Sequence, residues 1–263
     1  MFVRHGESSN NVHAANGQEA YTKNRVPDPE LSSRGMEQAR RVGELMTNPQ
    51  SADPFFGDPS TTTEVWVSPH LRALSTAAPF VAGISLASAS PPQVMVTTEL
   101  FEAGGIFDGL GQALGGLTRA EMAASFPTFA LPPEVGDSGW YVGPGRETNG
   151  ECRSRASSLV ARLRARALAL TTDETIVAVT HDYMICALLE VLLPGSTGGG
   201  AFPSSGGAGE LEATPPMMKP LDPNRKFTAW CHYNTGYVYK AAVNCFFAPR
   251  LDFVAHLNSF TAG

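Results

Sequence analysis

The composition indicates an acidic globular chain and excludes several classes of function. The 263 residues are 43% hydrophobic and 17% charged, which is enough apolar sequence for the core of one large domain or two small ones. The net charge of −6 disfavours nucleic acid or an anionic membrane as a partner, so an anionic substrate would need local cationic groups.

Targeting signals and metal-binding patterns are not evident in the sequence. We expect no membrane-spanning helix and no secretory signal, because there is no run of roughly 18 apolar residues and no basic segment before an apolar one. The four cysteines, at positions 152, 186, 231 and 245, lack the spacing of a zinc site or a CxxC pair. We therefore expect a cytoplasmic protein that uses no cofactor and no metal.

The first residues combine a short strand with side chains that suit phosphate chemistry. Met1 to Val3 form the expected strand, and Arg4, His5 and Gly6 follow at its end. A guanidinium binds phosphate through a rigid fork of donors, and a neutral imidazole can attack phosphorus. Gly6 lets the backbone approach a ligand closely. An Arg-His pair alone is more often a solvated surface pair, so the rest of the chain must support this interpretation.

The following elements alternate between helix and strand. In the first half we expect a polar loop over 8–24, a helix over 35–47, a strand over 64–67, a helix from Pro69 to about 81, a strand over 93–96 and a short helix over 118–125. In the second half we expect a helix over 147–170, a strand over 175–180, a helix over 183–193, and two strands over 227–232 and 237–243. We interpret 194–224, which is rich in Gly and Pro, as an insertion in a single domain over 1–263.

This alternation predicts an α/β fold, a three-layer αβα sandwich with a mostly parallel central sheet and helices on both faces. Ligands of such sheets bind beyond the carboxyl ends of the strands. The side chains expected at those ends are two histidines, two arginines, a serine and a carboxylate: Arg4, His5, Ser68, Arg72, Glu102 and His181. Their convergence supports a phosphate site.

The same segments resemble the histidine phosphatase superfamily, in its phosphoglycerate-mutase-like branch. The resemblance covers residues 3 to about 240. Its motifs are Arg4-His5-Gly6-Glu7-Ser8 with Asn11, Asp28-Pro29-Glu30-Leu31-Ser32-Ser33-Arg34-Gly35 with Gln38-Ala39, Ser68-Pro69-His70-Leu71-Arg72-Ala73 with Thr76-Ala77, Glu147-Thr148 with Glu151 and Arg155, Thr180-His181, and Asn234-Thr235.

The resemblance implies a metal-independent phosphomonoester hydrolase that forms a phosphohistidine on His5. It implies that Arg4, Arg72 and His181 bind the phosphoryl oxygens, and that Glu102 protonates the leaving group and then activates water. Asn11 is a further expected substrate ligand, although it could equally cap the loop. The expected partner is a small phosphorylated substrate or a phosphoprotein, and the oligomeric state stays open.

Three departures from the family pattern leave alternatives open. His70-Leu71 stands where the family usually has a Leu-Arg pair, and Asp182 replaces a Gly after the second histidine. The region after Glu102 lacks the insert of the mutases, so a mutase is the less favoured enzyme and a binding or scaffold protein is another alternative. Glu99 rivals Glu102 as the acid, and Glu7 is expected to be structural.

The shortness of the first strand carries a separate expectation. Strands usually contain about 5–6 residues, whereas only Met1 to Val3 precede the Arg-His pair. A central strand this short forms few ladder hydrogen bonds. Either the native protein begins upstream of Met1, which we favour, or its first strand is stunted.

Overall fold

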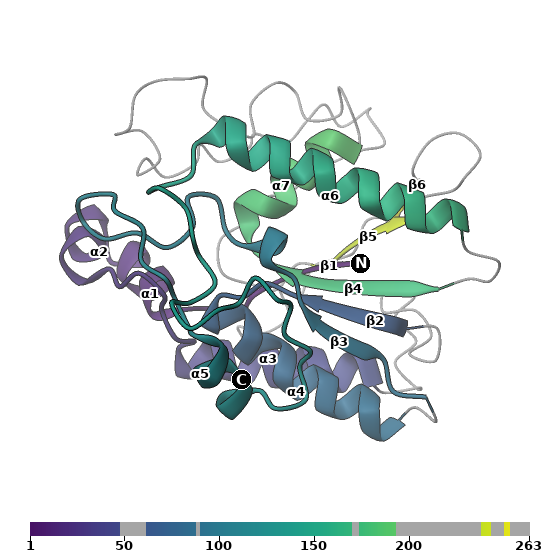
Figure 1. Ribbon diagram of the computed structural model, residues 1–263. Coiled ribbons are helices and arrows are strands. Elements are labelled where there is room, and N and C mark those ends of the chain that lie inside the picture. The colour runs from purple at the N-terminus through teal and green to yellow at the C-terminus, as the bar shows by residue number, and fades with distance from the viewer. Residues whose placement is uncertain (48–61, 88–89, 170–173, 193–237, 243–249, 253–263) are drawn as a thin grey trace, which may run out of the picture.

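The computed structural model describes residues 1–47, 62–87, 90–169, 174–192, 238–242 and 250–252 (Figure 1). The insertion expected at 194–224, the strand expected at 227–232 and the Asn234-Thr235 motif lie outside the described residues. Within the described part of the chain, no helix combines the length and the apolar character that crossing a bilayer requires.

A mixed sheet forms the centre of the molecule. Its strands are β1 (Phe2–Arg4), β2 (Thr62–Val67), β3 (Gln93–Val96), β4 (Thr175–Thr180), β5 (Val238–Ala242) and β6 (Arg250–Asp252), in the order β3-β2-β4-β1-β5-β6. Strands β3, β2, β4 and β1 run parallel to one another, whereas β5 runs antiparallel to β1 and to β6. The strand that carries Arg4 is therefore flanked on both sides.

Helices cover both faces of the sheet, which confirms the expected three-layer architecture. They are α1 (Ser9–Ala15), α2 (Gln18–Asn24), α3 (Ser33–Thr47), α4 (Leu71–Ala87), η2 (Thr98–Leu100), α5 (Arg119–Ser125), α6 (Asn149–Ala169) and α7 (Asp182–Leu192). Helices α3 and α4 pack on one face, and α6 and α7 on the other (Figure 1).

The strands feed two separate cores because successive side chains point to opposite faces of a sheet. In β2, Val65 and Val67 join the core beneath α3 and α4, whereas Trp66 joins the core beneath α6 and α7. Strand β4 repeats the pattern, with Val179 on the first face and Ala178 on the second. Both faces of these strands are buried, as the near-continuous apolar sequence predicts.

The polar loop expected over 8–24 is wrong, because the structure has helices α1 and α2 there. Ser8 caps α1 in a reciprocal box, in which Ser8 Oγ accepts from the Asn11 backbone and the Asn11 side chain accepts from the Ser8 backbone. Helix α4 also continues past the expected end near Val81, with Pro79 inside it. The capping box satisfies backbone groups in the first turn of α1. The apolar residues of this segment are not spaced regularly enough to predict a helix.

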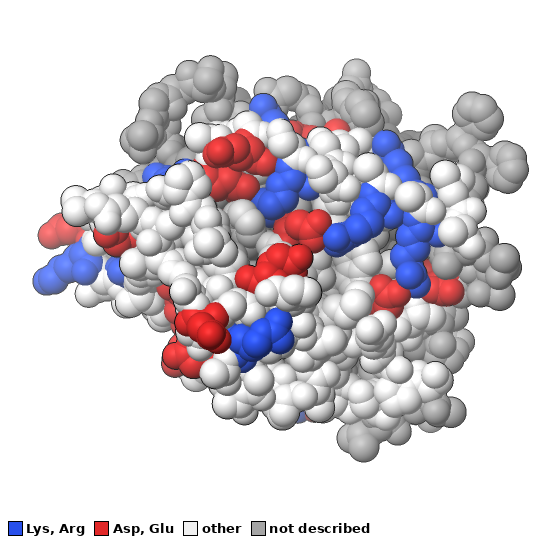
Figure 2. Space-filling view, viewed as in Figure 1, with Lys and Arg blue, Asp and Glu red and all other residues white. Residues whose placement is uncertain are grey.

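Charged side chains of both signs are mixed over the face that Figure 2 shows, with no single basic field. Three of the arginines of α6 pair with carboxylates here: Arg153 with Glu190, Arg162 with Glu99, and Arg166 with Glu64 and Glu174. This helix face is therefore an ion-paired surface.

Candidate active site

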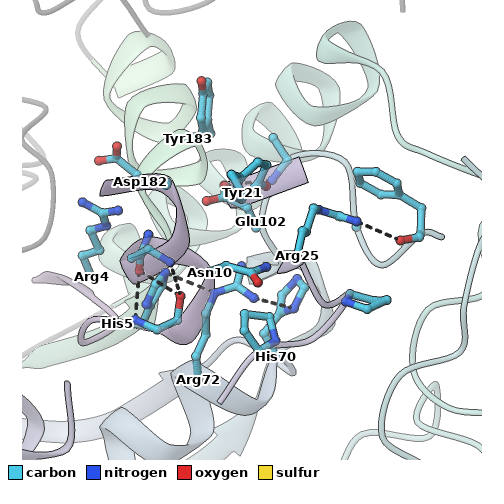
Figure 3. Close-up of a pocket in the computed structure, with 18 of the residues that line it drawn as sticks. Arg4, His5, Asn10, Tyr21, Arg25, His70, Arg72, Glu102, Asp182 and Tyr183 are labelled. Carbon is cyan, nitrogen blue, oxygen red and sulfur yellow. Dashed lines mark hydrogen bonds between the residues drawn. The ribbon is translucent and has the colours of Figure 1, made fainter. Parts of the chain in front are cut away.

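A cavity of about 360 Å³ opens beyond the carboxyl ends of the parallel strands (Figure 3). Five of the six predicted site residues line it, and they are Arg4, His5, Asn11, Arg72 and Glu102. Asp182, in the first turn of α7, also lines it. Side chains that are up to 178 positions apart in the sequence, between Arg4 and Asp182, thus meet in one pocket.

The hydrogen bonds of His5 determine where its proton lies. Nδ1 is 2.6 Å from the carbonyl oxygen of Gly6, which can only accept, so Nδ1 carries the hydrogen. Arg72 Nε lies 3.1 Å from Nε2 and can only donate, so Nε2 offers its lone pair. Burial, followed by the charges of Arg72 and Arg4, lowers the pKa of His5 well below its ordinary value. The imidazole is therefore neutral, with a basic nitrogen beside two cations.

The loop after β1 is fixed by close backbone packing. A Cβ on Gly6 would lie 2.6 Å from the carbonyl oxygen of Gly35, and one on Gly35 would lie 2.0 Å from that of Glu7. The Gly6 amide also donates to Thr76 Oγ1 at 3.0 Å, which ties the loop to α4. Glu7 accepts from Ser32 Oγ at 2.6 Å, as a structural residue would. This packing orients His5 through its own backbone.

Arg72 links His5 to a buried polar pair. Its Nη1 is 3.2 Å from His70 Nδ1 and 3.7 Å from Asp28 Oδ1, and His70 Nδ1 is 3.1 Å from the same carboxylate oxygen. Asp28 also accepts from the Leu71 amide. The guanidinium is therefore held at one end by Asp28 and His70 while its Nε faces His5. Sequence reasoning assigned no role to Asp28, although it lies within a quoted motif.

His181 lies behind His5 rather than on the wall of the cavity. Their ring centroids are 5.1 Å apart, and His181 is fully buried. Its Nε2 is 2.7 Å from Ser68 Oγ, whereas its Nδ1 has no hydrogen-bond partner among the described residues. Burial, followed by the charge of Arg72, lowers the pKa of His181 well below its ordinary value. A neutral imidazole with one open nitrogen thus stands next to the expected nucleophile.

The two candidate acids occupy different environments. Glu102 lines the cavity and accepts from the Ala103 amide at 2.9 Å. Burial is the largest influence on its carboxyl; Arg72 opposes it, Asp182 adds to it, and the resulting pKa is raised to about 7. Glu99 forms an ion pair with Arg162 at 2.9 Å on α6 and is not among the lining residues. Of these two carboxylates, Glu102 alone lines the cavity that His5 also lines.

Asn11 takes part in the capping box of α1 and also lines the cavity. The outer wall contains residues that sequence reasoning did not identify, namely Tyr21, Arg25, Phe107, Arg146 and Tyr183. Most of them lie on or beside loops and short helices, where no strand end or motif marks them. In the part of the chain that is described, no group of three or more His, Cys, Asp or Glu is arranged to hold a metal ion.

The model of the histidine phosphatase superfamily (branch 1) matches residues 1–200 of the chain. This match covers well over half of the sequence and includes the loop that carries His5 and the strand end that carries His181. The chain therefore belongs to the histidine phosphatase superfamily.

Comparison with solved structures gave matches at low sequence identity. The ecdysone phosphate phosphatase of Bombix mori, in complex with tungstate, is 16% identical, with 97% of this chain and 91% of that chain covered and a TM-score of 0.54. A mycobacterial glucosyl-3-phosphoglycerate phosphatase in complex with VO3 is 21% identical, with 96% of each chain covered and a TM-score of 0.47. At 16% identity, the similarity to the ecdysone phosphate phosphatase shows a shared fold alone. A comparison with curated protein sequences gave no match.

Proposed function

We propose that the protein is a phosphomonoester hydrolase in which His5 Nε2 attacks phosphorus. The observation that carries this proposal is the hydrogen-bonding state of His5. The Gly6 carbonyl oxygen accepts a hydrogen bond from Nδ1, so Nε2 carries the lone pair, which faces Arg72 Nε in a cavity that Arg4 and Arg72 also line. A neutral, oriented imidazole beside two guanidinium groups suits in-line attack on a phosphate dianion.

In the first step of the proposed reaction, Nε2 forms a bond to phosphorus while the bond to the ester oxygen breaks. Glu102 gives its proton to that oxygen, which leaves as an alcohol. In the second step the Glu102 carboxylate takes a proton from water, whose oxygen bonds to phosphorus while the bond from phosphorus to Nε2 breaks, which releases inorganic phosphate and restores His5. The pKa of about 7 for Glu102 supports both roles near neutral pH.

The cationic side chains act by binding the phosphoryl oxygens in the transition state. Arg4 and Arg72 line the cavity on the side of His5. Phosphoryl transfer depends mainly on positioning and on charge stabilisation, which two guanidinium groups supply. We assign His181 to the same task on account of its open Nδ1 and its 5.1 Å distance from the His5 ring. Because His181 does not line the cavity, the His181→Ala variant tests this assignment separately.

The proposal predicts that His5→Ala abolishes hydrolysis of p-nitrophenyl phosphate in EDTA, because His5 forms the covalent bond in the proposed reaction. The wild type, quenched without acid, should yield a phosphoprotein that is labile to acid and stable to base, as a phosphoramidate is. His13→Ala, which removes a histidine of α1 outside the cavity, is the matched control. His181→Ala and Arg72→Ala should lower kcat by several orders of magnitude.

Two results would contradict the proposal. One is a His5→Ala variant that keeps a tenth of the wild-type rate. The other is a folded wild type that turns over no member of a panel of phosphorylated metabolites and phosphotyrosine peptides, which would favour the binding or scaffold role.

A further inference from the structure

A second group of cationic side chains lies in the same cavity, away from Arg4 and His5. It consists of Arg25 and Arg146 with the ring of Phe107, and all three line the pocket. In Figure 3, Arg25 lies on one side of Glu102 and points away from the labelled Arg4 and His5, which lie on the other. We call these three residues the outer arginine cluster.

The aromatic ring fixes both guanidinium groups. The Arg25 guanidinium carbon is 4.3 Å from the centroid of the Phe107 ring, and that of Arg146 is 4.7 Å from the same centroid. Arg25 Nη1 also donates to the Phe107 carbonyl oxygen at 3.4 Å, and the Arg146 amide donates to the Gly111 carbonyl oxygen at 3.1 Å. A guanidinium held over a ring keeps its N–H donors in its own plane, where they can reach a ligand.

The local charge is unusual for this molecule. The chain carries a net charge of −6, yet here two positive groups share one ring. Among the described residues, Arg25 forms no ion pair, in contrast to the paired arginines of α6. Two like charges held this close raise the electrostatic energy, and an anion between or beside them lowers it. The cluster therefore favours a negatively charged ligand group.

We infer that the outer arginine cluster binds a second anionic group, a carboxylate or a phosphate, carried by the leaving group of the substrate. This inference rests on the proposed function. When the phosphoryl group is at His5, the ester oxygen faces Glu102, and the rest of the substrate extends past Glu102 toward Arg25. The cavity of about 360 Å³ suits a compact substrate.

Matched substrate pairs test the inference. The carboxylate arm compares 3-phosphoglycerate with glycerol 3-phosphate, and 6-phosphogluconate with sorbitol 6-phosphate, which differ only at the remote carbon. The phosphate arm compares fructose 1,6-bisphosphate with fructose 6-phosphate. We expect the wild type to prefer the anionic member of at least one pair by about tenfold in kcat/KM, the effect of one or two charge-assisted hydrogen bonds. The pair that shows the preference identifies the anion and its distance from the ester.

Variants then connect the preference to the cluster. Arg25→Gln and Arg146→Gln should each reduce the ratio of kcat/KM within that pair by about tenfold, and Arg25→Lys should keep part of the preference because it keeps the charge. Arg162→Gln is the control, since Arg162 also stacks on an aromatic ring, that of Trp66, but lies on α6 outside the cavity. Thermal unfolding checks that each variant is folded.

The outcomes separate this inference from the proposed function. A wild-type ratio near one for every pair, or ratios that the Gln variants leave unchanged, would overturn the inference while hydrolysis itself stands. If the folded wild type hydrolyses neither these esters nor p-nitrophenyl phosphate, the proposed function fails. Calorimetric Kd values for the same pairs then decide the inference, with tighter binding of the anionic member that Arg25→Gln removes as the supporting result.

Discussion

Glu102 is the residue whose protonation is expected to control turnover. Its pKa of about 7 means that the carboxyl loses its proton as the pH rises through neutrality. Protonation of a poor leaving group then fails, so kcat/KM for an alkyl phosphate should fall at alkaline pH. The ratio of alkyl to p-nitrophenyl phosphate hydrolysis between pH 7 and 9 measures this, because both esters are dianions above their second ionisation near about pH 6.

The same carboxyl can be tested by substitution. Glu102→Gln should remove that alkaline decline and slow alkyl phosphates more than p-nitrophenyl phosphate, whose phenolate leaves without a proton. Glu99→Gln serves as the control, since Glu99 pairs with Arg162 outside the cavity. Equal losses on both esters would remove Glu102 from the acid role.

At the scale of elements, the contact between α3 and the loop after β1 positions the nucleophile. Gly35→Ala would put a Cβ 2.0 Å from the Glu7 carbonyl oxygen, which is backbone and cannot turn aside. We expect a loss of about 1–3 kcal/mol or more in the free energy of unfolding, from forced displacement in a packed contact. We also expect a lower kcat, because the displaced loop carries His5.

Urea unfolding and p-nitrophenyl phosphate kinetics check this prediction. Gly109→Ala is the control, since a Cβ there would meet no atom within 4 Å. If Gly35→Ala matches Gly109→Ala in both measurements, the contact does not position the loop.

The elements with apolar faces were predictable from the sequence, whereas α1 and α2 were not. The strand at 175–180 and the helix at 147–170 match β4 and α6 within two residues at each end. Helices α1 and α2 contain no fully buried residue, so no apolar periodicity marks them. The capping box of Ser8 and Asn11 was the available signal.

Site residues at strand ends were predictable from the sequence, whereas those on loops and at a helix end were not. Residues at strand ends, such as His5 and His181, converge because parallel strands end at one edge, which the alternation of elements predicts. Arg25 and Arg146 come from a helix end and a long loop, whose path depends on packing around glycines at 104, 105 and 116 with positive φ. No local pattern in the sequence fixes that path.

At the scale of the whole molecule, three buried imidazoles make the native state sensitive to acid. The pKa values of His5, His70 and His181 lie below the ordinary 6.5, that of His70 at about 4 because of burial and then the charge of Arg72. Below pH 6.5 the unfolded chain binds protons that the folded protein does not. The free energy of unfolding should therefore decrease as the pH falls from 6.5 toward 4, by roughly 3 kcal/mol for His70 alone.

Urea unfolding of His70→Leu between pH 4.5 and 8 tests this. The variant should lose less stability on acidification than the wild type, with His13→Leu as the control. Glu102 acts in the opposite direction, because its raised pKa lets the folded state hold an extra proton between pH 4.5 and 7. The His70→Leu variant and its reference protein should therefore both carry Glu102→Gln. An identical pH dependence of the free energy of unfolding with and without His70→Leu would show that His70 does not contribute to the acid sensitivity.

The position of β1 in the sheet has a consequence for biosynthesis. Both neighbours of β1 come late in the chain, because β4 begins at Thr175 and β5 at Val238. At a translation rate of about 5–20 residues per second, the first of them follows β1 out of the ribosome after an interval on the order of ten to forty seconds. During that time Phe2 and Val3 lack both of the strands with which they pair, and His5 lacks the neighbouring strand β4. The residue proposed to react is therefore synthesised well before the strands that flank it.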